Sequence, residues 1–261
     1  MNRGGIHHRP RGAGGPPLLL LHGFLGSPRA WDAVLAALPH HGPAWCPWLP
    51  GHGPALPLPA DWDAAVAGLA AALPAGGIVA GYSMGARLAL AAALRRPDAA
   101  RATLLVSGHP GPADAASRAE RAAADAARAA ALRQGTLADF VAAWEALPLF
   151  STQQALPAAA LRAQRAQRLG HDARALAWSF ERGGQSCMPD LRGAIAATPQ
   201  RLRLLTGALD RAYDELGAAL ARPPHVAHRS VAGVGHNLLL EAPAAVAASI
   251  ALLMKSPWET A

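Results

Sequence analysis

Ser83 stands in a setting that favours a reactive hydroxyl. A short apolar run, Gly77–Ala80, precedes it, Gly81 and Gly85 flank it, and an alanine- and leucine-rich helix is predicted over Leu88–Leu94. A strand, a G-x-S-x-G turn and a helix together make a nucleophile elbow, whose tight turn projects the serine hydroxyl above the sheet edge. The alternative is a turn of small residues before a buried helix, because glycine and alanine are common in this chain.

A serine hydroxyl needs a base, and the sequence offers a histidine and an acid at fitting positions. Asp210 and His236 each follow a segment that is predicted to be a strand. A histidine can act as a base near neutral pH, and an aspartate can hold its imidazole in one tautomer. The order Ser83, Asp210, His236 is that of nucleophile, acid and histidine in α/β-hydrolases. We therefore predict these three residues to be catalytic.

Other acids and histidines compete for these roles. Asp190 and Asp214 are the competing acids, but neither ends a predicted strand. His22 and His52 lie in glycine-containing turns, where we expect them to shape or line a pocket. The others are expected to be surface or internally satisfied side chains: His109, His171, His225 and His228.

Negative charge that develops near Ser83 would need hydrogen-bond donors. The N–H of Met84, the residue after the serine, would lie at the start of the elbow helix and face that charge. The apolar strand predicted over 17–21 leads into His22-Gly23-Phe24, where hydrolase-type folds place a second donor. The backbone N–H groups of Phe24 and Met84 are therefore the predicted oxyanion donors.

Apolar runs alternate with helical patterns through most of the chain, which predicts a mostly parallel sheet flanked by helices. The length allows one domain with an insertion or two domains. Strands are predicted over 17–21, 44–48, 77–80, 102–106, 201–205 and 226–231, and helices over 28–38, 61–73, 88–94, 213–221 and 243–254. Ser27 is the expected cap of the first of these helices. The two ends, Met1–Gly15 and Lys255–Ala261, are expected to be loose.

The pattern changes between residues 113 and 191, where no strand-like run occurs. Alanine- and arginine-rich helices are predicted there, over 115–134, 137–147, 158–169 and 173–180. We interpret 113–191 as a helical cap inserted in an α/β core that comprises 1–112 and 192–261.

Charge and composition bound the classes of function. The 261 residues are 52% hydrophobic and 16% charged, as expected of a globular chain with a sizeable core. The net charge is +7 and Lys255 is the only lysine, so arginine carries almost all the positive charge. Arginine binds carboxylates bidentately, which favours an anionic small-molecule substrate. Because the arginines are dispersed and no apolar stretch is long enough, neither nucleic-acid binding nor a membrane span is expected.

Motifs for metals and cofactors are missing from the sequence. It has no H-E-x-x-H, no P-loop and no G-x-G-x-x-G, so we expect no metal and no cofactor. Cys46 and Cys187 are too few for a disulfide framework, and the first fifteen residues lack the apolar segment of a secretory signal. A cytoplasmic protein with reduced thiols is expected. The sequence leaves the oligomeric state open, a monomer included.

From about Leu18 to Leu253 the chain is similar to one family of α/β-hydrolase-fold enzymes. The general motifs are L-H-G-F-L-G at 21–26, P-G-H-G at 50–53 and G-H-N at 235–237. More specific are G-Y-S-M-G-A-R at 81–87, S-G-H-P-G at 107–111, Glu120-Arg121 with Asp125 following, Trp144 with P-L-F at 148–150, the stretch 168–191, and G-A-L-D-R-A-Y at 207–213. These segments resemble the synthases of menaquinone biosynthesis that form 2-succinyl-6-hydroxy-2,4-cyclohexadiene-1-carboxylate (SHCHC). The chain departs from the family's usual residues at Ala86, Glu145, Arg211 and Tyr213.

The resemblance implies an activity and a binding site. Members of the family eliminate pyruvate from 2-succinyl-5-enolpyruvyl-6-hydroxy-3-cyclohexene-1-carboxylate (SEPHCHC), with the serine acting as a base. The implied substrate-binding residues are Arg87, Arg121, Arg168, Tyr82 and Trp144. Arg118 and Arg165 are the alternatives nearest in helix register, and a solvated helix face is the other reading of each arginine.

Two other functions remain open on the sequence alone. The same three catalytic residues would serve a carboxylesterase, a thioesterase or a carbon–carbon bond hydrolase, because one fold hosts many reactions. A hydrolase fold used only for binding is the second alternative. An arginine-lined pocket favours the synthase, because ester substrates are often neutral.

Overall fold

The computed structural model describes residues 4–54 and 57–255, which form a seven-stranded sheet in the order β1-β3-β2-β4-β5-β6-β7. Within these residues β1 runs antiparallel to β3, and the other neighbouring strands are parallel. The bounds are β1 Gly5–His8, β2 Leu18–Leu21, β3 Ala44–Pro47, β4 Gly77–Tyr82, β5 Ala100–Val106, β6 Arg201–Gly207 and β7 Val226–Val231. The predicted mostly parallel α/β sheet is thereby confirmed.

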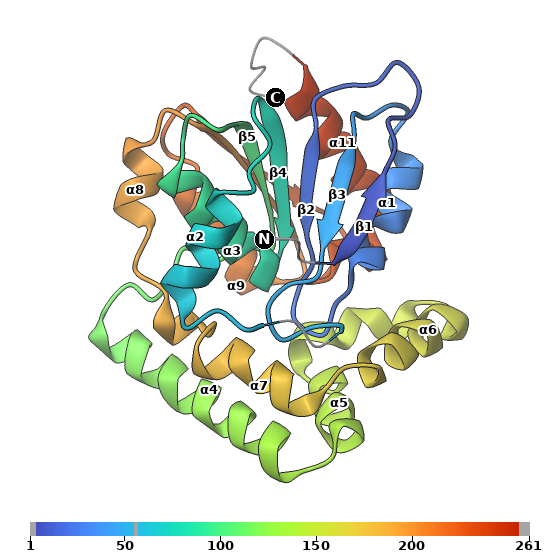
Figure 1. Ribbon diagram of the computed structural model, residues 1–261, viewed down its shortest axis with the longest axis vertical. Coiled ribbons are helices and arrows are strands. Elements are labelled where there is room, and N and C mark those ends of the chain that lie inside the picture. Colours follow the sequence, from blue (N-terminus) through green and yellow to red (C-terminus); the bar gives the residue numbers. More distant parts are fainter. Residues whose placement is uncertain (1–3, 55–56, 256–261) are drawn as a thin grey trace.

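Helices cover both faces of this sheet (Figure 1). On one face, α1 (Asp32–Ala37) and α11 (Pro243–Met254) bury Val34 and Ile250 in a core that includes Leu20 of β2. On the other, α2 (Trp62–Ala70) and α3 (Met84–Arg95) bury Trp62 and Leu88. The remaining elements of this part are η1 (Pro28–Trp31), α8 (Arg192–Ala197), α9 (Arg211–Leu220) and α10 (Leu238–Glu241).

The N-terminal segment differs from the prediction of a loose end. Gly5–His8 form β1, and Ile6 pairs with Cys46 in β3. Their glycine- and histidine-rich sequence carries no strand pattern, so only pairing with an exposed sheet edge makes them a strand. At the opposite end, residues 256–261 lie outside the described part of the chain.

Ser27 stands at the predicted helix start, but its side chain does not cap the helix. The helix begins as the 3-10 turn η1, and the Ser27 hydroxyl makes no capping hydrogen bond. Asp61, by contrast, caps α2 by accepting a hydrogen bond from the N–H of Ala64 at 2.8 Å. A capping residue type thus marked both helix starts, but only one of the two side chains turns back onto the backbone.

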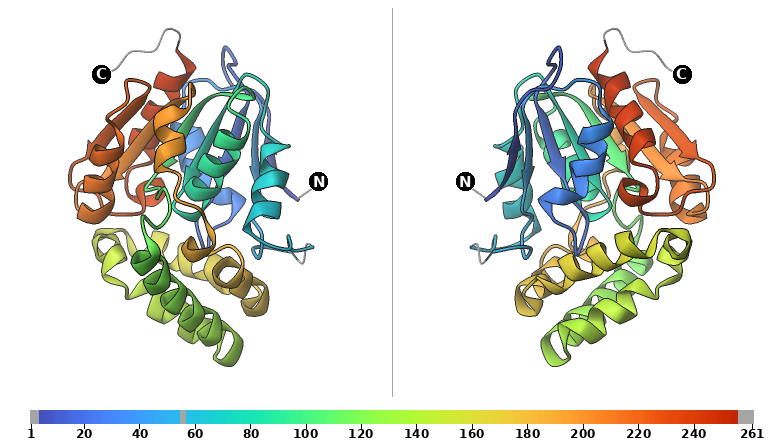
Figure 2. Two further views of the ribbon diagram at one scale, coloured as in Figure 1. Left: turned by 90° about the vertical axis from the view of Figure 1, so that its left-hand side faces the viewer. Right: turned by 90° about the vertical axis from the view of Figure 1, so that its right-hand side faces the viewer.

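Between β5 and β6 the chain forms a helical cap (Figures 1 and 2). Its elements are α4 (Ala115–Gln134), α5 (Leu137–Glu145), η2 (Pro148–Ala155), α6 (Ala158–Leu169), α7 (Ala173–Glu181) and η3 (Gln185–Cys187). It has a core of its own, in which Phe140, Val141 and Leu176 pack together with Leu25 from the loop after β2. The cap is therefore anchored on the end of the sheet where the parallel strands finish.

None of the helices in the described part is long and apolar enough to cross a membrane.

Candidate active site

Ser83 sits on a strained turn between β4 and α3. Its backbone has φ 51° and ψ −108°, a conformation that residues other than glycine rarely adopt. A Cβ at Gly81 would come within 2.2 Å of the Gly85 carbonyl oxygen, and one at Gly85 within 2.3 Å of the Leu21 carbonyl oxygen. Both positions therefore require glycine, and the crowded turn holds Ser83 at the end of the strand.

Ser83, His236 and Asp210 form one hydrogen-bonded line. His236 Nε2 lies 3.0 Å from Ser83 Oγ, and His236 Nδ1 lies 2.6 Å from Asp210 Oδ2. An ionised carboxylate only accepts hydrogen bonds, so Nδ1–H donates to Asp210, and the bare Nε2 accepts from the serine hydroxyl. The imidazole is 1% exposed. The side chains come from the ends of β4, β6 and the loop after β7, and this geometry suits proton abstraction from the serine.

A hydrogen bond to its carbonyl oxygen and contacts with aromatic side chains hold His236 in place. The Ser107 hydroxyl, at the end of β5, donates to the His236 carbonyl oxygen at 2.8 Å. Aromatic rings surround the imidazole, with ring centroids 4.7 Å away for Tyr213, 5.6 Å for Tyr82 and 6.0 Å for Phe150. The imidazole is thus fixed and shielded from water on several sides.

The loop after β2, which contains Phe24, packs against Tyr82, the residue before Ser83, and is fixed from two directions. Leu25 has φ 56°, and its N–H donates to His52 Nε2 at 3.0 Å. Its carbonyl oxygen accepts from Gln167 Nε2 of the cap at 3.1 Å. Met84 begins α3, so its N–H has no acceptor within the helix. The geometry is compatible with Phe24 and Met84 as oxyanion donors, and that role stays a prediction.

His22 and His52 support this loop as neutral side chains. His22 Nδ1 donates to the Gly23 carbonyl oxygen at 2.8 Å, and its Nε2 accepts from the Leu49 N–H at 3.2 Å. Burial lowers the pKa of His22 to about 3 and that of His52 well below its usual value. The two rings lie 5.1 Å apart, and proximity to His22 further lowers the pKa of His52.

We expect these buried histidines to make the protein sensitive to acid. In the unfolded chain a histidine takes up a proton near pH 6.5, whereas folded His22 stays neutral down to about pH 3. Unfolding therefore takes up protons below pH 6.5, and the free energy of unfolding should fall by about 1.4 kcal/mol per pH unit for each such histidine. Urea unfolding at pH 8, 6 and 5 measures this slope. His22→Asn should show a shallower slope, and a free energy that stays constant from pH 7 to 5 would contradict the argument.

Two of the three predicted substrate-binding arginines are buried in this region. Arg87, on α3 one turn after Ser83, is 8% exposed, and its Nη1 donates to the Gly183 carbonyl oxygen at 3.3 Å. Burial lowers its pKa. Arg168, on α6, is 5% exposed, lies over the ring of Phe150 at 5.8 Å and donates to Glu145 Oε1 at 3.0 Å. Cap and core thus each contribute a desolvated guanidinium.

The other predicted binding residues lie in the same region with different exposure. Arg121 is exposed on α4 and influences the pKa values of Arg87, His109 and Tyr213 through its charge. Trp144 is half-buried, with its ring centroid 4.8 Å from that of Phe24. Tyr82 is buried beside His236. Their roles toward a substrate stay predictions.

Known proteins resemble this chain over nearly its whole length. A family model described as "Alpha/beta hydrolase family" matches residues 18–249. The 2-succinyl-6-hydroxy-2,4-cyclohexadiene-1-carboxylate synthase of Enterobacter sp. (strain 638) is 33% identical over 247 residues, 93% of each chain. The synthase of the same name from Salmonella agona (strain SL483) is 32% identical over 95% of this chain and 97% of that one. The chain belongs to this synthase family.

Solved structures agree with membership of the synthase family. A structure described as MenH from S. aureus is 25% identical, with a TM-score of 0.90 over 97% of this chain and 98% of that one. A thermophilic esterase from Thermogutta terrifontis is 22% identical, with a TM-score of 0.77 over 95% of this chain and 91% of that one, a likeness of fold alone. This member of the synthase family is therefore an enzyme with the α/β-hydrolase fold, as the sequence predicted.

The sequence pointed to Asp125 and Arg118 but did not predict the partners through which they organise the site of this family member. Asp125 of α4 accepts from the Ser186 hydroxyl at 3.1 Å and is buried against Gly184, which holds the turn that contacts Arg87. Arg118, a register alternative for substrate binding, instead donates to the Met188 carbonyl oxygen at 2.8 Å. No signal in the sequence pairs these residues, because they are more than 50 positions apart.

Proposed function

We propose that the protein converts SEPHCHC to SHCHC and pyruvate in menaquinone biosynthesis. The observation that carries this proposal is the hydrogen-bonded line of Ser83, His236 and Asp210 beside two buried arginines, Arg87 and Arg168. A base and two cations suit proton removal from a substrate that carries several carboxylates. The names of the relatives support the same reaction.

The first step is removal of a ring proton. In SEPHCHC the proton at C2 lies between the succinyl ketone and the ring double bond, so the carbanion left behind is delocalised. Ser83 Oγ takes this proton while its own proton passes to His236 Nε2, 3.0 Å away. Asp210 accepts from Nδ1–H at 2.6 Å and offsets the positive charge of the imidazolium.

The second step expels the leaving group. The electron pair from C2 forms the C2–C3 double bond, the C3–C4 π pair moves to C4–C5, and the C5–O bond breaks. Enolpyruvate leaves and takes up a proton at carbon to become pyruvate, so atoms and charge balance. The N–H groups of Phe24 and Met84 would stabilise the ketone oxygen as it gains negative charge in the first step.

The substrate carboxylates require cations and an apolar surface around the ring. Arg87, Arg121 and Arg168 would hold the carboxylates, because guanidinium groups bind them with charge-assisted hydrogen bonds. Tyr82 and Trp144 would supply aromatic surface to the ring and to the succinyl arm.

Cys46 and Cys187 are free thiols. We assign the enzyme to the cytoplasm, where thiols stay reduced.

Pyruvate release from SEPHCHC by the purified protein tests the proposal. Because Ser83 would act as a base, the intact mass during turnover should stay that of the unmodified protein. A serine hydrolase with the same three residues would instead form an acyl-enzyme and cleave simple esters. Ester hydrolysis together with no pyruvate release would replace the synthase by the hydrolase.

Removal of any of the three proposed substrate-binding arginines should lower the catalytic efficiency, kcat/KM. Replacing Arg87, Arg121 or Arg168 by alanine should lower kcat/KM about 10- to 150-fold, the worth of a charge-assisted contact of about 1.5–3 kcal/mol. Lysine should recover only part, because it lacks the planar fork. Arg87→Ala should also lower kcat, because Arg87 lies one turn from Ser83. Steady-state kinetics measure both constants.

Arg133→Ala is the matched control for these substitutions. Arg133 is also on a cap helix, but it is exposed and pairs with Glu181 on α7. Its removal should change kcat/KM by less than about twofold, as for a surface position away from a site. Equal effects of Arg133→Ala and the three predicted arginines would remove the arginines from substrate binding.

A further inference from the structure

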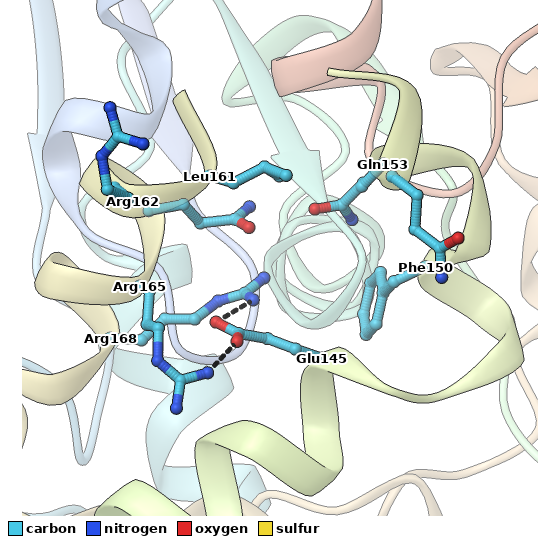
Figure 3. Close-up of a pocket in the computed structure, with 9 residues that line it drawn as sticks. Glu145, Phe150, Gln153, Leu161, Arg162, Arg165 and Arg168 are labelled. Atoms are coloured by element: carbon cyan, nitrogen blue, oxygen red, sulfur yellow. Dashed lines mark hydrogen bonds and ion pairs between the residues drawn. The ribbon is translucent and has the colours of Figure 1, made fainter. Parts of the chain in front are cut away.

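Glu145 reaches from the end of α5 between two arginines of α6 (Figure 3). Its Oε1 accepts from Arg168 Nη1 at 3.0 Å, and its Oε2 accepts from Arg165 Nη1 at shorter range. Arg165 and Arg168 are three residues apart, so they lie on one face of the helix. One carboxylate therefore bridges two guanidinium groups.

The two arginines differ in their access to water. The side chain of Arg168 is 6% exposed, that of Arg165 43% and that of Glu145 24%. They line a cavity of about 220 Å³, together with Arg162, whose guanidinium points away from Glu145 in Figure 3. Three arginines and one carboxylate leave this cavity with excess positive charge, and the deepest of its cations, Arg168, is one of the two that share Glu145.

Arg168 also faces the Ser83 side of the cap. Its guanidinium lies over Phe150 at 5.8 Å, and the Phe150 ring lies 6.0 Å from the His236 imidazole. Arg168 further lines a second, smaller cavity that includes Tyr82 and the loop containing Phe24. The guanidinium thus stands at the boundary between the outer cavity and the site, with its charge already paired.

We propose that Glu145 occupies on Arg168 the place that a substrate carboxylate takes, and that binding exchanges one carboxylate for the other. Glu145 is then a specificity-determining residue, and this role rests on the proposed function. The exchange leaves no charge unpaired, because Glu145 keeps Arg165 as its partner while the substrate takes Arg168. A neutral ligand has no carboxylate to exchange, so it cannot displace Glu145 from Arg168, and the pocket discriminates against it.

The test begins with Glu145→Gln, which keeps the shape and removes the competing charge. KM for SEPHCHC should fall by about two- to fivefold, the scale of a partly exposed ion pair, while kcat changes little. Damage to the fold would not lower KM. Asp139→Asn is the control: it removes an acid from the same helix α5, where its carboxylate accepts from Thr136. Its KM should stay nearer the wild-type value, because no contact with Arg168 is lost.

Substitution of Arg165, the second partner of Glu145, should change KM in the opposite direction. Arg165→Gln leaves Glu145 wholly to Arg168, so KM should rise. Arg162→Gln removes the same charge from the same cavity without a contact to Glu145, and its rise in KM should be smaller. In the double variant Glu145→Gln with Arg165→Gln, the extra effect of losing Arg165 should disappear, which a double-mutant cycle measures as coupling.

The outcomes separate this inference from the proposed function. Absence of pyruvate release by the wild-type enzyme overturns the proposed function, and the exchange with it. With an active wild type, a higher KM in Glu145→Gln shows that Glu145 orients Arg168 for the substrate, which overturns the exchange alone. An unchanged KM in both Glu145→Gln and Arg165→Gln overturns it as well.

Discussion

Ser83→Ala should lower the turnover of SEPHCHC by about 10⁴-fold or more, the scale seen when serine enzymes lose their serine. Alanine keeps the Cβ, so the strained backbone at φ 51° and the crowding of Gly81 and Gly85 are unchanged. Only the hydroxyl that contacts His236 is lost. Residual activity would come from the proposed binding arginines and oxyanion donors. Pyruvate release at saturating substrate measures the effect.

Ser107→Ala is a matched control for this variant. Ser107 also follows a strand and also has positive φ, at 48°, but its hydroxyl donates to the His236 carbonyl oxygen and not to the imidazole. Its loss should cost turnover far less, because Glu241 also holds this backbone by accepting from the N–H groups of Gly235 and Asn237. Near-normal turnover of Ser83→Ala, with circular dichroism like that of the wild type, would exclude Ser83 as the base.

Asp210→Asn should lower kcat by about 10³- to 10⁴-fold, because asparagine disturbs the tautomer of His236. The wild-type carboxylate accepts from Nδ1–H at 2.6 Å and so leaves Nε2 bare toward Ser83. An amide can instead donate to Nδ1, which moves the imidazole proton to Nε2 and removes the base. KM should change much less than kcat, because the substitution does not alter the arginines.

Asp214→Asn separates this effect from a general loss of charge. Asp214 lies four residues along the chain, and the sequence left it open as a competing acid. It accepts from the Thr206 hydroxyl at 2.6 Å and lies 3.4 Å from His228, away from the hydrogen-bonded line. Its substitution should leave kcat within a few-fold of wild type. If kcat falls further in Asp214→Asn than in Asp210→Asn, the acid that supports His236 is Asp214 and our assignment of Asp210 is wrong.

The parts of the fold that could be predicted from sequence are those with strong local signals. The apolar runs of β2 and β5 and the helices α4, α6 and α11 appear where their patterns placed them. The strand β1 could not be predicted, because its residues lack strand character and depend on the edge of β3. The local sequence pattern identifies an element whose own apolar residues are buried. It does not identify an element, such as β1, that forms only by pairing with a strand distant in the sequence.

The candidate site, like the fold, has parts that could be predicted from the sequence and parts that could not. The G-x-S-x-G turn and the positions after β6 and β7 were sufficient to predict that Ser83, Asp210 and His236 would meet, because parallel strands end at one edge. The surroundings of the arginines were not predictable. Helix periodicity places Arg165 and Arg168 on one face, but the carboxylate that bridges them comes from another helix. Such pairs depend on how the cap helices pack, which composition does not encode.

The hydrogen bonds between the cap and the loops after β2 and β3 have a consequence for the timing of the reaction. Gln167 of α6 holds the Leu25 carbonyl oxygen, and the Gly53 N–H donates to His171 just beyond the same helix at 3.2 Å. If α6 moves outward to let a ligand leave, these bonds break and the Phe24 N–H loses part of its support. If the Phe24 N–H is the oxyanion donor that we propose, ligand escape and loss of that donor are then a single event. On that proposal, we expect the enzyme to be competent only while the cap is closed.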